Sequence, residues 1–435
     1  RDGDTVLVDA GEYADACRWT ANDLVIRGVG GYAHVRDRTT AGKAIWVIQG
    51  NNTTVEWIEF SGATVQDCNG AGIRQEGADL TVRHCFFHDN ENGILAGDNA
   101  QSRILIEHSR FARNGYGDGY SHNMYINHVA EFTIRYSFVE AAKVGHNVKS
   151  RAFRTFILCN GITSGDGTTS REIDLPNGGL AVVAGNVIVH GSATQNSNLL
   201  GYGLEGLSNP IHSLFVTHNT FVTARGAGLF VQLPGSGTDT LVMRNNIFAG
   251  RASAAGGDAA LLDTAANLLA RDPADARFSD VTAFEYTPLA GSPAVDAAIA
   301  AVNVWGQPLL PEMEYVHPAG ARMRVTAGAP DIGALEYRPP VSVIMPPSAS
   351  TMHVEGPWPQ PARDRAHLRI TNTRERTLTI HVRDMAGRLL RAQRAETNEP
   401  GSTTVMIDMT GLGPGWYFCT ISGGSASQQR MLLIR

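Results

Sequence analysis

The chain has 435 residues, of which 43% are hydrophobic, 18% are charged and 47 are glycine. This composition is typical of a β-rich, turn-rich protein and excludes a largely helical or disordered chain. The formal net charge is −6, and no apolar run reaches about 18 residues, so neither nucleic-acid binding nor a membrane-spanning segment is indicated. Five cysteines are too few for a disulfide framework, so the hydrophobic core has to hold the fold.

The first residues, RDGDTVLVDAGEY, predict direct passage into a strand without a charged and apolar leader. In an exported protein, the signal peptide would therefore already be absent from this numbering.

A repeated β-rich segment follows, with a polar residue two positions before its final apolar residue. The copies are LTVRHCFF (80–87), ILIEHSRF (104–111), FTIRYSFV (132–139), TFILCNGI (155–162), AVVAGNVI (181–188), LFVTHNTF (214–221) and LVMRNNIF (241–248). Their polar positions recur at intervals of 23 to 33 residues, which predicts a coil of short parallel strands. We expect the polar column, from Cys85 to Asn246, to occupy left-handed bends and to bond from coil to coil. The apolar column, from Phe60 to Phe248, should stack inside.

This repeat, the opening GDTVLVDAGEY…LVIRGVGG and the closing SPAVDA…DIGALEY resemble bacterial right-handed parallel β-helices of the pectate-lyase-like superfamily. The resemblance covers about residues 1–337 and implies an all-β fold, a right-handed parallel β-helix solenoid. Tailspikes, adhesins and many carbohydrate enzymes share this scaffold, so the resemblance leaves the chemistry open.

Residues 338–355, with the sequence RPPVSVIMPPS near their start, predict a Pro-rich linker. Alternating strands and Gly-containing turns over residues 356–435 predict a small antiparallel β-sandwich. This tail resembles the C-terminal sorting domain of type IX secretion cargo in its Pro-x-Pro start, its turn at 384–387, its Leu412…Tyr417 segment and its basic end at Arg435. The resemblance implies a bacterial, Bacteroidota-like protein that is secreted or held at the cell surface by way of the outer-membrane secretion machinery. An ordinary carbohydrate-binding or spacer sandwich is the alternative.

A second strand follows each copy of the repeat and carries the candidate site. Its inward aliphatic side chains are Ile73, Ile94, Met124, Val148 and Ile173, and the side chains between them should point outwards. One predicted outward column contains Arg74, Leu95, Tyr125, Lys149 and Asp174, and its neighbour contains Asn123, Asn147 and Glu172. Stacked coils lie about 4.8 Å apart, so the polar members, with Arg151 two residues beyond Lys149, should form one patch the size of one or two sugar residues.

Further residues are expected to border this patch. His122 and His146 precede equivalent strands, and Arg171 is their counterpart in the next coil. Two insertions, ARNGYGDGYS and GSATQNSN, flank these coils, and Tyr202 and Glu205 lie just past the second. Insertions on one face of a solenoid often mark its binding face, so we expect the loops to form two walls.

The first functional hypothesis is β-elimination on a uronate-containing polysaccharide, which needs cations for the carboxylate, a base for the C5 proton and an acid for the leaving oxygen. Arg151 and Arg171 would bind the carboxylate. Lys149, one of only three lysines in the chain, would be the base, because an ammonium can lose its proton and a guanidinium cannot. Tyr125 or a histidine would be the acid.

A Lys and an Arg in adjacent coils are similar to the pattern of the alginate and chondroitin lyase family on this scaffold. Glu172 and Asp174 depart from a simple polyanion site, because they would repel the substrate unless Ca²⁺ lies between them. No other cofactor is expected.

Two other functions stay open. Glu172 and Asp174, about 6.7 Å apart on one strand, match the lower end of the spacing of inverting glycoside hydrolases. A non-catalytic glycan-binding adhesin or surface structural protein is the third. The same residues also have structural interpretations: Asn123 and Asn147 as ladder residues, the two histidines as turn caps, and Lys149 with the carboxylates as a salt-bridge network. A zinc site built on His122 and His146 is disfavoured, because no compact spacing supports it.

Overall fold

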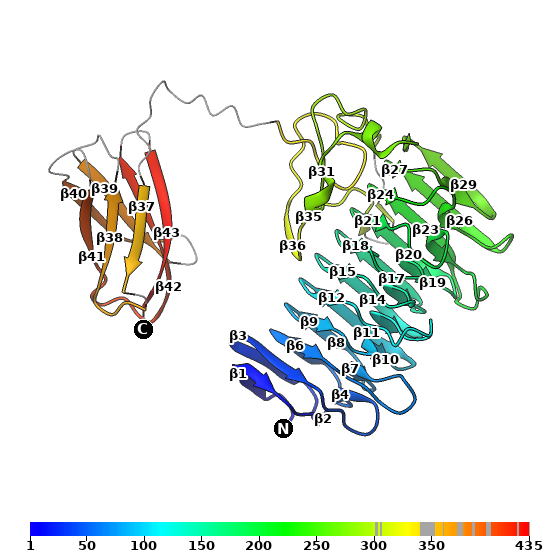
Figure 1. Ribbon diagram of the computed structural model, residues 1–435, viewed down its shortest axis with the longest axis horizontal. Helices are drawn as coiled ribbons and strands as arrows, with labels where there is room; N and C mark the ends of the chain where they lie inside the picture. Colours follow the sequence, from blue (N-terminus) through cyan, green and yellow to red (C-terminus); the bar gives the residue numbers. More distant parts are fainter. Residues whose placement is uncertain are drawn as a thin grey trace. The chain divides into compact units, whose positions relative to one another are not determined.

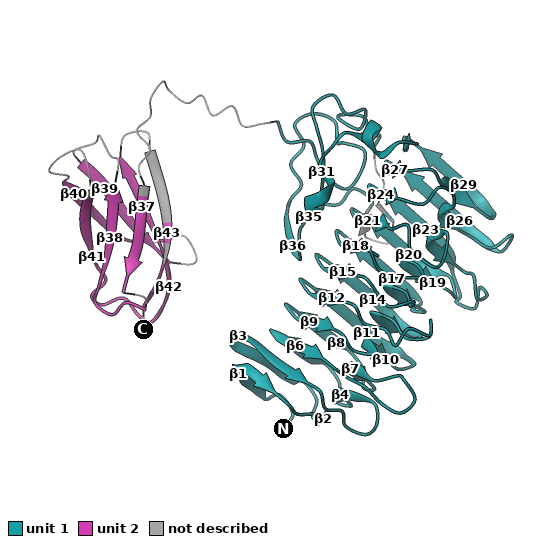
Figure 2. Cartoon of the chain, viewed as in Figure 1, with its two compact units in different colours: residues 1–339 teal, residues 340–435 magenta. Residues whose placement is uncertain are grey.

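The computed structural model describes residues 1–300, 303–304, 307–339, 353–359, 361–371, 377–384, 388–396, 402–423 and 426–434. The chain divides into two compact units, residues 1–339 and 340–435 (Figure 2). Most of the predicted Pro-rich linker, the predicted turn after Asp384 and the basic end at Arg435 lie outside the described residues.

The first unit is a parallel β-solenoid, as predicted (Figure 1). One parallel sheet has ten strands: β2 (Cys17–Trp19), β4 (Ala44–Ile48), β7 (Ala71–Gln75), β10 (Asn92–Ala96), β13 (Met124–Ile126), β16 (Val148–Ser150), β19 (Ile173–Leu175), β22 (Asn198–Tyr202), β25 (Leu229–Gln232) and β28 (Ser253–Gly256). Typical coils add one strand to this sheet and two to a twenty-stranded sheet.

The twenty-stranded sheet is also parallel throughout. Its strands are β1 (Thr5–Tyr13), β3 (Val25–Arg36), β5 (Thr53–Glu56), β6 (Ile58–Ser61), β8 (Leu80–Arg83), β9 (Phe86–His88), β11 (Asn99–Glu107), β12 (Arg110–Ala112), β14 (Val129–Arg135), β15 (Phe138–Glu140), β17 (Arg154–Leu158), β18 (Gly161–Thr163), β20 (Gly179–Ala184), β21 (Val187–His190), β23 (His212–Thr217), β24 (Thr220–Thr223), β26 (Thr238–Arg244), β27 (Ile247–Ala249), β29 (Ala259–Ala265) and β30 (Leu268–Ala270).

The predicted apolar column from Phe60 to Phe248 is confirmed. Its eight members are paired coil by coil in the strand register, and all are buried. The rings of Phe60, Phe87 and Phe111 stack with centroids 4.9 and 4.8 Å apart. These distances equal the spacing of neighbouring strands, so the aromatic stack follows directly from the solenoid geometry.

From Asn160 to Asn246 the polar column forms a buried ladder of amides between the two strands that each coil adds to the twenty-stranded sheet. The backbone N–H of Asn160 donates to Oδ1 of Asn186, and that of Asn186 donates to Oδ1 of Asn219. The coil-to-coil bonding is therefore as predicted. The predicted left-handed conformation of these residues is wrong, because the preceding residue adopts it, as at Cys159 (φ 53°) and His218 (φ 50°). One residue makes the bend, and the next is then free to direct its amide along the stack.

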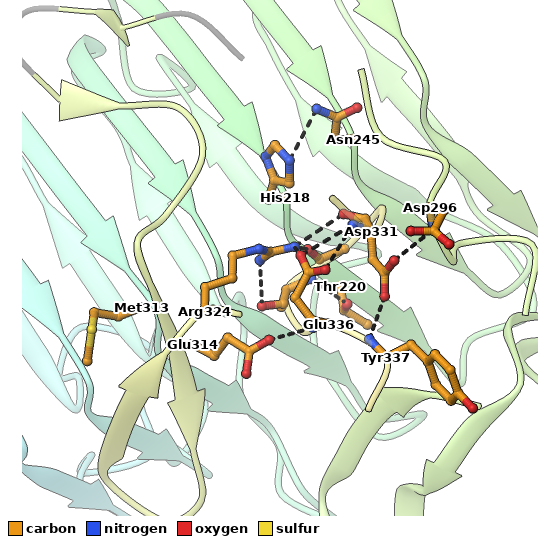
Figure 3. Close-up of polar contacts among 12 residues, drawn as sticks. His218, Thr220, Asn245, Asp296, Met313, Glu314, Arg324, Asp331, Glu336 and Tyr337 are labelled. Carbon is orange, nitrogen blue, oxygen red and sulfur yellow. Dashed lines mark hydrogen bonds and ion pairs between the residues drawn. The ribbon is translucent and has the colours of Figure 1, made fainter. Parts of the chain in front are cut away.

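A closing segment covers part of the twenty-stranded sheet and contains η1 (Pro273–Ala276), β31 (Phe278–Asp280), η2 (Val281–Ala283), β32 (Glu285–Pro288), β33 (Asn303–Val304), β34 (Gln307–Pro308), β35 (Met313–Val316) and β36 (Gly320–Met323). A buried ion pair between Arg324 and Glu336 lies at its centre (Figure 3). Beside it, the N–H of Ala334 donates to Oγ1 of Thr220 on β24 at 3.1 Å. The DIGALEY sequence thus fastens this segment to the solenoid.

The second unit consists of small antiparallel sheets, as predicted. One contains β37 (His353–Trp358), β38 (Arg365–Thr371) and β41 (Ser402–Asp408), and the other contains β39 (Thr377–Arg383), β40 (Leu389–Glu396), β42 (Gly415–Gly423) and β43 (Ala426–Ile434). Buried side chains of both sheets, including Leu368 and Ile380, form one apolar cluster. In the described part of the chain, no helix has the length and apolar character needed to span a membrane.

Candidate functional site

The candidate site lies on the outer face of the ten-stranded sheet, across β13, β16 and β19. Tyr125 pairs with Lys149, and Lys149 pairs with Asp174, so the predicted outward column is in register. The alternate residues Met124, Val148 and Ile173 are fully buried in the core. Strand alternation therefore holds the phenol, the ammonium and the carboxylate on one face.

His122 and His146 form a stacked pair at the start of β13 and β16, with ring centroids 5.0 Å apart. Nδ1 of His122 accepts the backbone N–H of His146 at 3.0 Å, and Nδ1 of His146 accepts that of Arg171 at 3.2 Å. Because each Nδ1 is an acceptor, the proton of each neutral ring is on Nε2. Burial, followed by nearby positive charge, lowers the pKa of both rings well below the usual value. Both histidines are therefore neutral with the proton on Nε2, and an imidazolium acid at either position is disfavoured.

Glu205 connects the two cations of β16 and its following turn. Nζ of Lys149 donates to Oε1 of Glu205 at 2.9 Å, and a guanidinium nitrogen of Arg151 donates to Oε2 at 2.5 Å. Burial opposes ionisation of Glu205, but the hydrogen bonds from Arg151 and Lys149 outweigh it and lower its pKa to about 2. Nε of Arg151 also donates to the hydroxyl of Tyr125 at 2.8 Å. The phenol oxygen is thus an acceptor, and its own proton is available to another group.

Asp174 is the buried carboxylate of the site. Its Oδ1 accepts from Arg171 at 3.1 Å. Its Oδ2 lies 3.4 Å from Nε2 of His146 and 3.6 Å from Nζ of Lys149, and accepts no hydrogen bond from the described residues. Burial raises the pKa of Asp174, although Arg171 and Lys149 oppose the shift. This oxygen can therefore accept a proton beside the ammonium of Lys149.

The predicted outward orientation of Asn123 and Asn147 is wrong. Both are fully buried, and Nδ2 of Asn123 donates to Oδ1 of Asn147 at 2.7 Å, in a second amide ladder that also includes Asn90 and Asn114. They lie just before β13 and β16, in the turn, where strand alternation does not apply. Their amides hold the turn and are not available to a substrate, so the ladder interpretation is correct.

Glu172 is also turned into the interior, against the prediction. It is 0% exposed, and its Oε1 is 2.9 Å from Nδ1 of the equally buried His190. Burial raises its pKa, and the contact with His190 opposes this shift. Glu172 therefore offers no surface carboxylate to a hydrolase pair or to a Ca²⁺ ion shared with Asp174. The dependence on Ca²⁺ remains a prediction.

The residues predicted to form the two walls differ in their positions. Tyr202 is buried in the core, and its hydroxyl donates to the carbonyl of Gly179 at 2.6 Å, so its predicted role at the surface is wrong. Glu205, three residues on, reaches Lys149 and Arg151. In the first insertion, Tyr116 and Tyr120 are exposed.

Two asparagines of the site were not predicted from the sequence. Oδ1 of Asn198 accepts from Nε of Arg171 at 3.0 Å, and Oδ1 of Asn177 accepts from a guanidinium nitrogen of Arg151. They orient the two arginines. Asn177 stands in the turn sequence PNGG, which carries no signal for function beyond that of a turn.

The buried neutral histidines predict loss of stability in mild acid. Burial lowers the pKa of His122 and His146, and that of His218 to about 3, whereas the unfolded chain takes up these protons near pH 6.5. The unfolded state therefore binds more protons below that pH, and each histidine lowers the free energy of unfolding by up to about 1.4 kcal/mol per pH unit. Urea unfolding between pH 8 and 5 should show this fall, and His122→Asn should reduce its slope. An unchanged slope in His122→Asn would contradict the assignment, because only this comparison isolates the histidine from other titrating groups.

Comparison with known proteins identifies the C-terminal domain. Residues 357–435 match the family model of the secretion system C-terminal sorting domain. A search of curated proteins and a search of solved structures found no match. The sorting domain implies contact with the type IX secretion machinery. The chain is accordingly a bacterial secreted or cell-surface protein with a parallel β-solenoid and a C-terminal sorting domain.

Proposed function

We propose that the solenoid cleaves a uronate-containing polysaccharide by β-elimination at the patch formed by Tyr125, Lys149, Arg151, Arg171 and Asp174. The observation that carries the proposal is the charge of this patch. Lys149, Arg151 and Arg171 outnumber the carboxylates of Asp174 and Glu205, because Glu172 points into the interior and the histidines are neutral. Counted together with the neighbouring Glu205, the patch has one excess positive charge, and this favours an anionic ligand.

Glu205 supports a carboxylate as the group that is bound. Its two oxygens accept from Lys149 and Arg151, which is the bridging contact that a uronate carboxylate would make. Its side chain is 47% exposed, and it lies between Gly203 and Gly206, which both have positive φ. A substrate carboxylate is thus expected to take the place of Glu205. The guanidinium of Arg151, which keeps its charge when Lys149 acts as the base, then neutralises the carboxylate charge that opposes removal of the C5 proton.

The remaining groups fit the proton transfers of elimination. Lys149 would remove the C5 proton, after passing its own proton to the free oxygen of Asp174 at 3.6 Å. The C4–O bond then breaks as the C4–C5 double bond forms, and the departing oxygen takes a proton from Tyr125. The hydroxyl of Tyr125 accepts from Arg151 and so keeps its own hydrogen for donation. General acid–base catalysis of this kind contributes roughly 10²- to 10⁴-fold to a rate.

A hollow further along the same sheet supports a polymeric substrate. Its volume is about 1050 Å³, and it borders the turns that lead into β25 and β28, two and three strands beyond β19. Its lining includes three arginines and two aspartates, so cations are in excess by one: Arg225, Arg251, Arg271, Asp272 and Asp275. Neighbouring strands lie about 4.8 Å apart, so Arg225 and Arg251, in the turns before β25 and β28, are roughly 10 to 15 Å further along the solenoid, within reach of the next sugars of an acidic chain.

The test is incubation with uronate-containing and neutral polysaccharides, with and without chelator, while ultraviolet absorbance and reducing ends are followed together. Elimination produces an unsaturated sugar, so both signals should rise with an acidic substrate. An increase in reducing ends without ultraviolet absorbance would indicate hydrolysis instead of elimination. Binding without either signal would make the patch a glycan-binding surface. In that case the ion pairs of Lys149, Arg151 and Arg171 with carboxylates would serve binding alone.

Glu205→Gln tests the competition between Glu205 and the substrate. The amide is a weaker partner for Lys149 and Arg151, so KM for an acidic oligosaccharide should fall roughly two- to five-fold, as expected from a partly exposed ion pair. Initial rates over a range of substrate concentrations measure this change. Glu76→Gln is the matched control, because Glu76 pairs with Lys43 at a remote coil. A higher KM in Glu205→Gln alone would mean that Glu205 assists binding.

A further inference from the structure

A second cluster of ligating side chains lies on the outer face of the twenty-stranded sheet, near the N-terminal end of the solenoid. His34 on β3 pairs with Glu59 on β6, and Ser61, two residues along β6, pairs with His88 on β9. The intervening residues Val35, Phe60 and Phe87 are buried. Three successive strands therefore present two imidazoles and a carboxylate on one outward face.

The ligating atoms are already close together. Oε1 of Glu59 lies 2.9 Å from Nε2 of His88 and 3.9 Å from Nε2 of His34, and the ligand atoms of all three residues are within 4.8 Å of one another. Tetrahedral zinc, with bonds of about 2.0 to 2.2 Å, places its ligand atoms roughly 3.3 Å apart. Side-chain movements of about 1 Å or less would complete this geometry.

Neighbouring residues contact both rings, and Asp89 orients that of His88. Nδ1 of His88 is 2.9 Å from Oδ2 of Asp89, the carboxylate contact that keeps Nδ1 protonated in metal-binding histidines and leaves Nε2 for the metal. Asp89 is itself held by Arg113 at 2.8 Å. Nε2 of His34 is 2.7 Å from Oγ of Ser61. The three ligating side chains are 16 to 21% exposed, so an ion can reach them from solvent.

We propose that His34, Glu59 and His88 bind a divalent transition-metal ion, Zn²⁺ foremost, with a fourth position open to water or to Ser61. Two imidazole nitrogens and one carboxylate oxygen suit Zn²⁺, whereas Ca²⁺ requires six to eight oxygen ligands. The ion would link the strands β3, β6 and β9. Because the unfolded chain lacks this arrangement, binding should stabilise the solenoid. The site is on a different sheet from the proposed lyase site and does not depend on it.

Calorimetric titration of the full-length protein with ZnCl₂ at neutral pH should show one saturable site that CaCl₂ does not fill. Glu59→Gln keeps the shape of the side chain and removes its charge, and it should weaken Zn²⁺ binding at least about 100-fold, as should His88→Ala. Asp89→Asn, which changes the group that orients His88 and removes no ligand, should cost about 10-fold. His128→Ala is the matched control, since His128 is a partly exposed histidine outside the cluster.

Two outcomes would overturn the proposal. One is the absence of saturable Zn²⁺ binding to the wild-type chain. The other is wild-type affinity in both Glu59→Gln and His88→Ala, which would assign the ion to other residues. Circular dichroism of the metal-free variants separates loss of a ligand from loss of the fold. A Zn²⁺-dependent rise in Tm in the wild type and in His128→Ala, absent from Glu59→Gln, would support the site by an independent measurement.

Discussion

Lys149→Met should lower the rate of elimination about 10²- to 10⁴-fold, because methionine keeps an unbranched side chain and removes the amine that takes the C5 proton. The loss should appear in kcat, measured from the ultraviolet absorbance of the unsaturated product. Arg171 pairs with Asp174 at 3.1 Å, so the buried carboxylate should keep a cation in this variant. The fold should persist, and urea unfolding would confirm it.

Two further lysine variants test whether Lys149 acts by removing a proton or only by its positive charge. Lys149→Arg keeps a cation that cannot act as a base, so it should be about as inactive as Lys149→Met. Lys43→Met is the matched control, because Lys43 forms an ion pair with Glu76 away from the site. Its activity should be that of the wild type. Full activity in Lys149→Arg would reduce the role of Lys149 to binding, and full activity in Lys149→Met would remove it from the mechanism.

The second large effect is expected in the amide ladder of the twenty-stranded sheet, which contains Asn186, Asn219 and Asn246. Nδ2 of Asn219 donates to the carbonyls of Val183 and Thr217, and its Oδ1 accepts from the backbone and side chain of Asn186. Asn219→Ala leaves these buried groups without partners, and each such group costs about 1 to 3 kcal/mol. The free energy of unfolding should fall by about 3 to 5 kcal/mol, measured by urea denaturation of the full chain.

Asn267→Ala is the control for position in the ladder. Asn267 accepts from Asn246 and donates to the carbonyl of Met243, but it is only partly buried, so water can replace its lost bonds. Its loss of stability should be less than half that of Asn219→Ala. A loss of below about 1 kcal/mol in Asn219→Ala would show that the ladder follows the fold without stabilising it.

Repetition explains which parts of the structure could be predicted from the sequence. The column from Phe60 to Phe248 and the pairing of Tyr125 with Lys149 and Asp174 were predicted, because every coil repeats the same alternation and one register satisfies all coils. The tail was recognisable from its own turns, independently of the solenoid, and residues 357–435 match the sorting-domain family.

The wrongly predicted side-chain orientations are found at the boundaries of strands. Asn123, Asn147 and Glu172 directly precede β13, β16 and β19, and alternation assigned them to the outer face. They belong to the turns, whose geometry directs these side chains inwards. A single residue decides this boundary, and periodicity does not locate strand ends that closely.

Residues far apart in sequence meet only in the tertiary structure. Glu205 reaches Lys149 across 56 positions, because two coils of unequal length separate them. His34, Glu59 and His88 meet because stacking places residues 25 and 29 positions apart on adjoining strands. The sequence by itself determined the solenoid, its core column and the sorting domain, since each depends on a local pattern. The tertiary structure decided which polar groups face each other, because that depends on turn geometry and on the length of each coil.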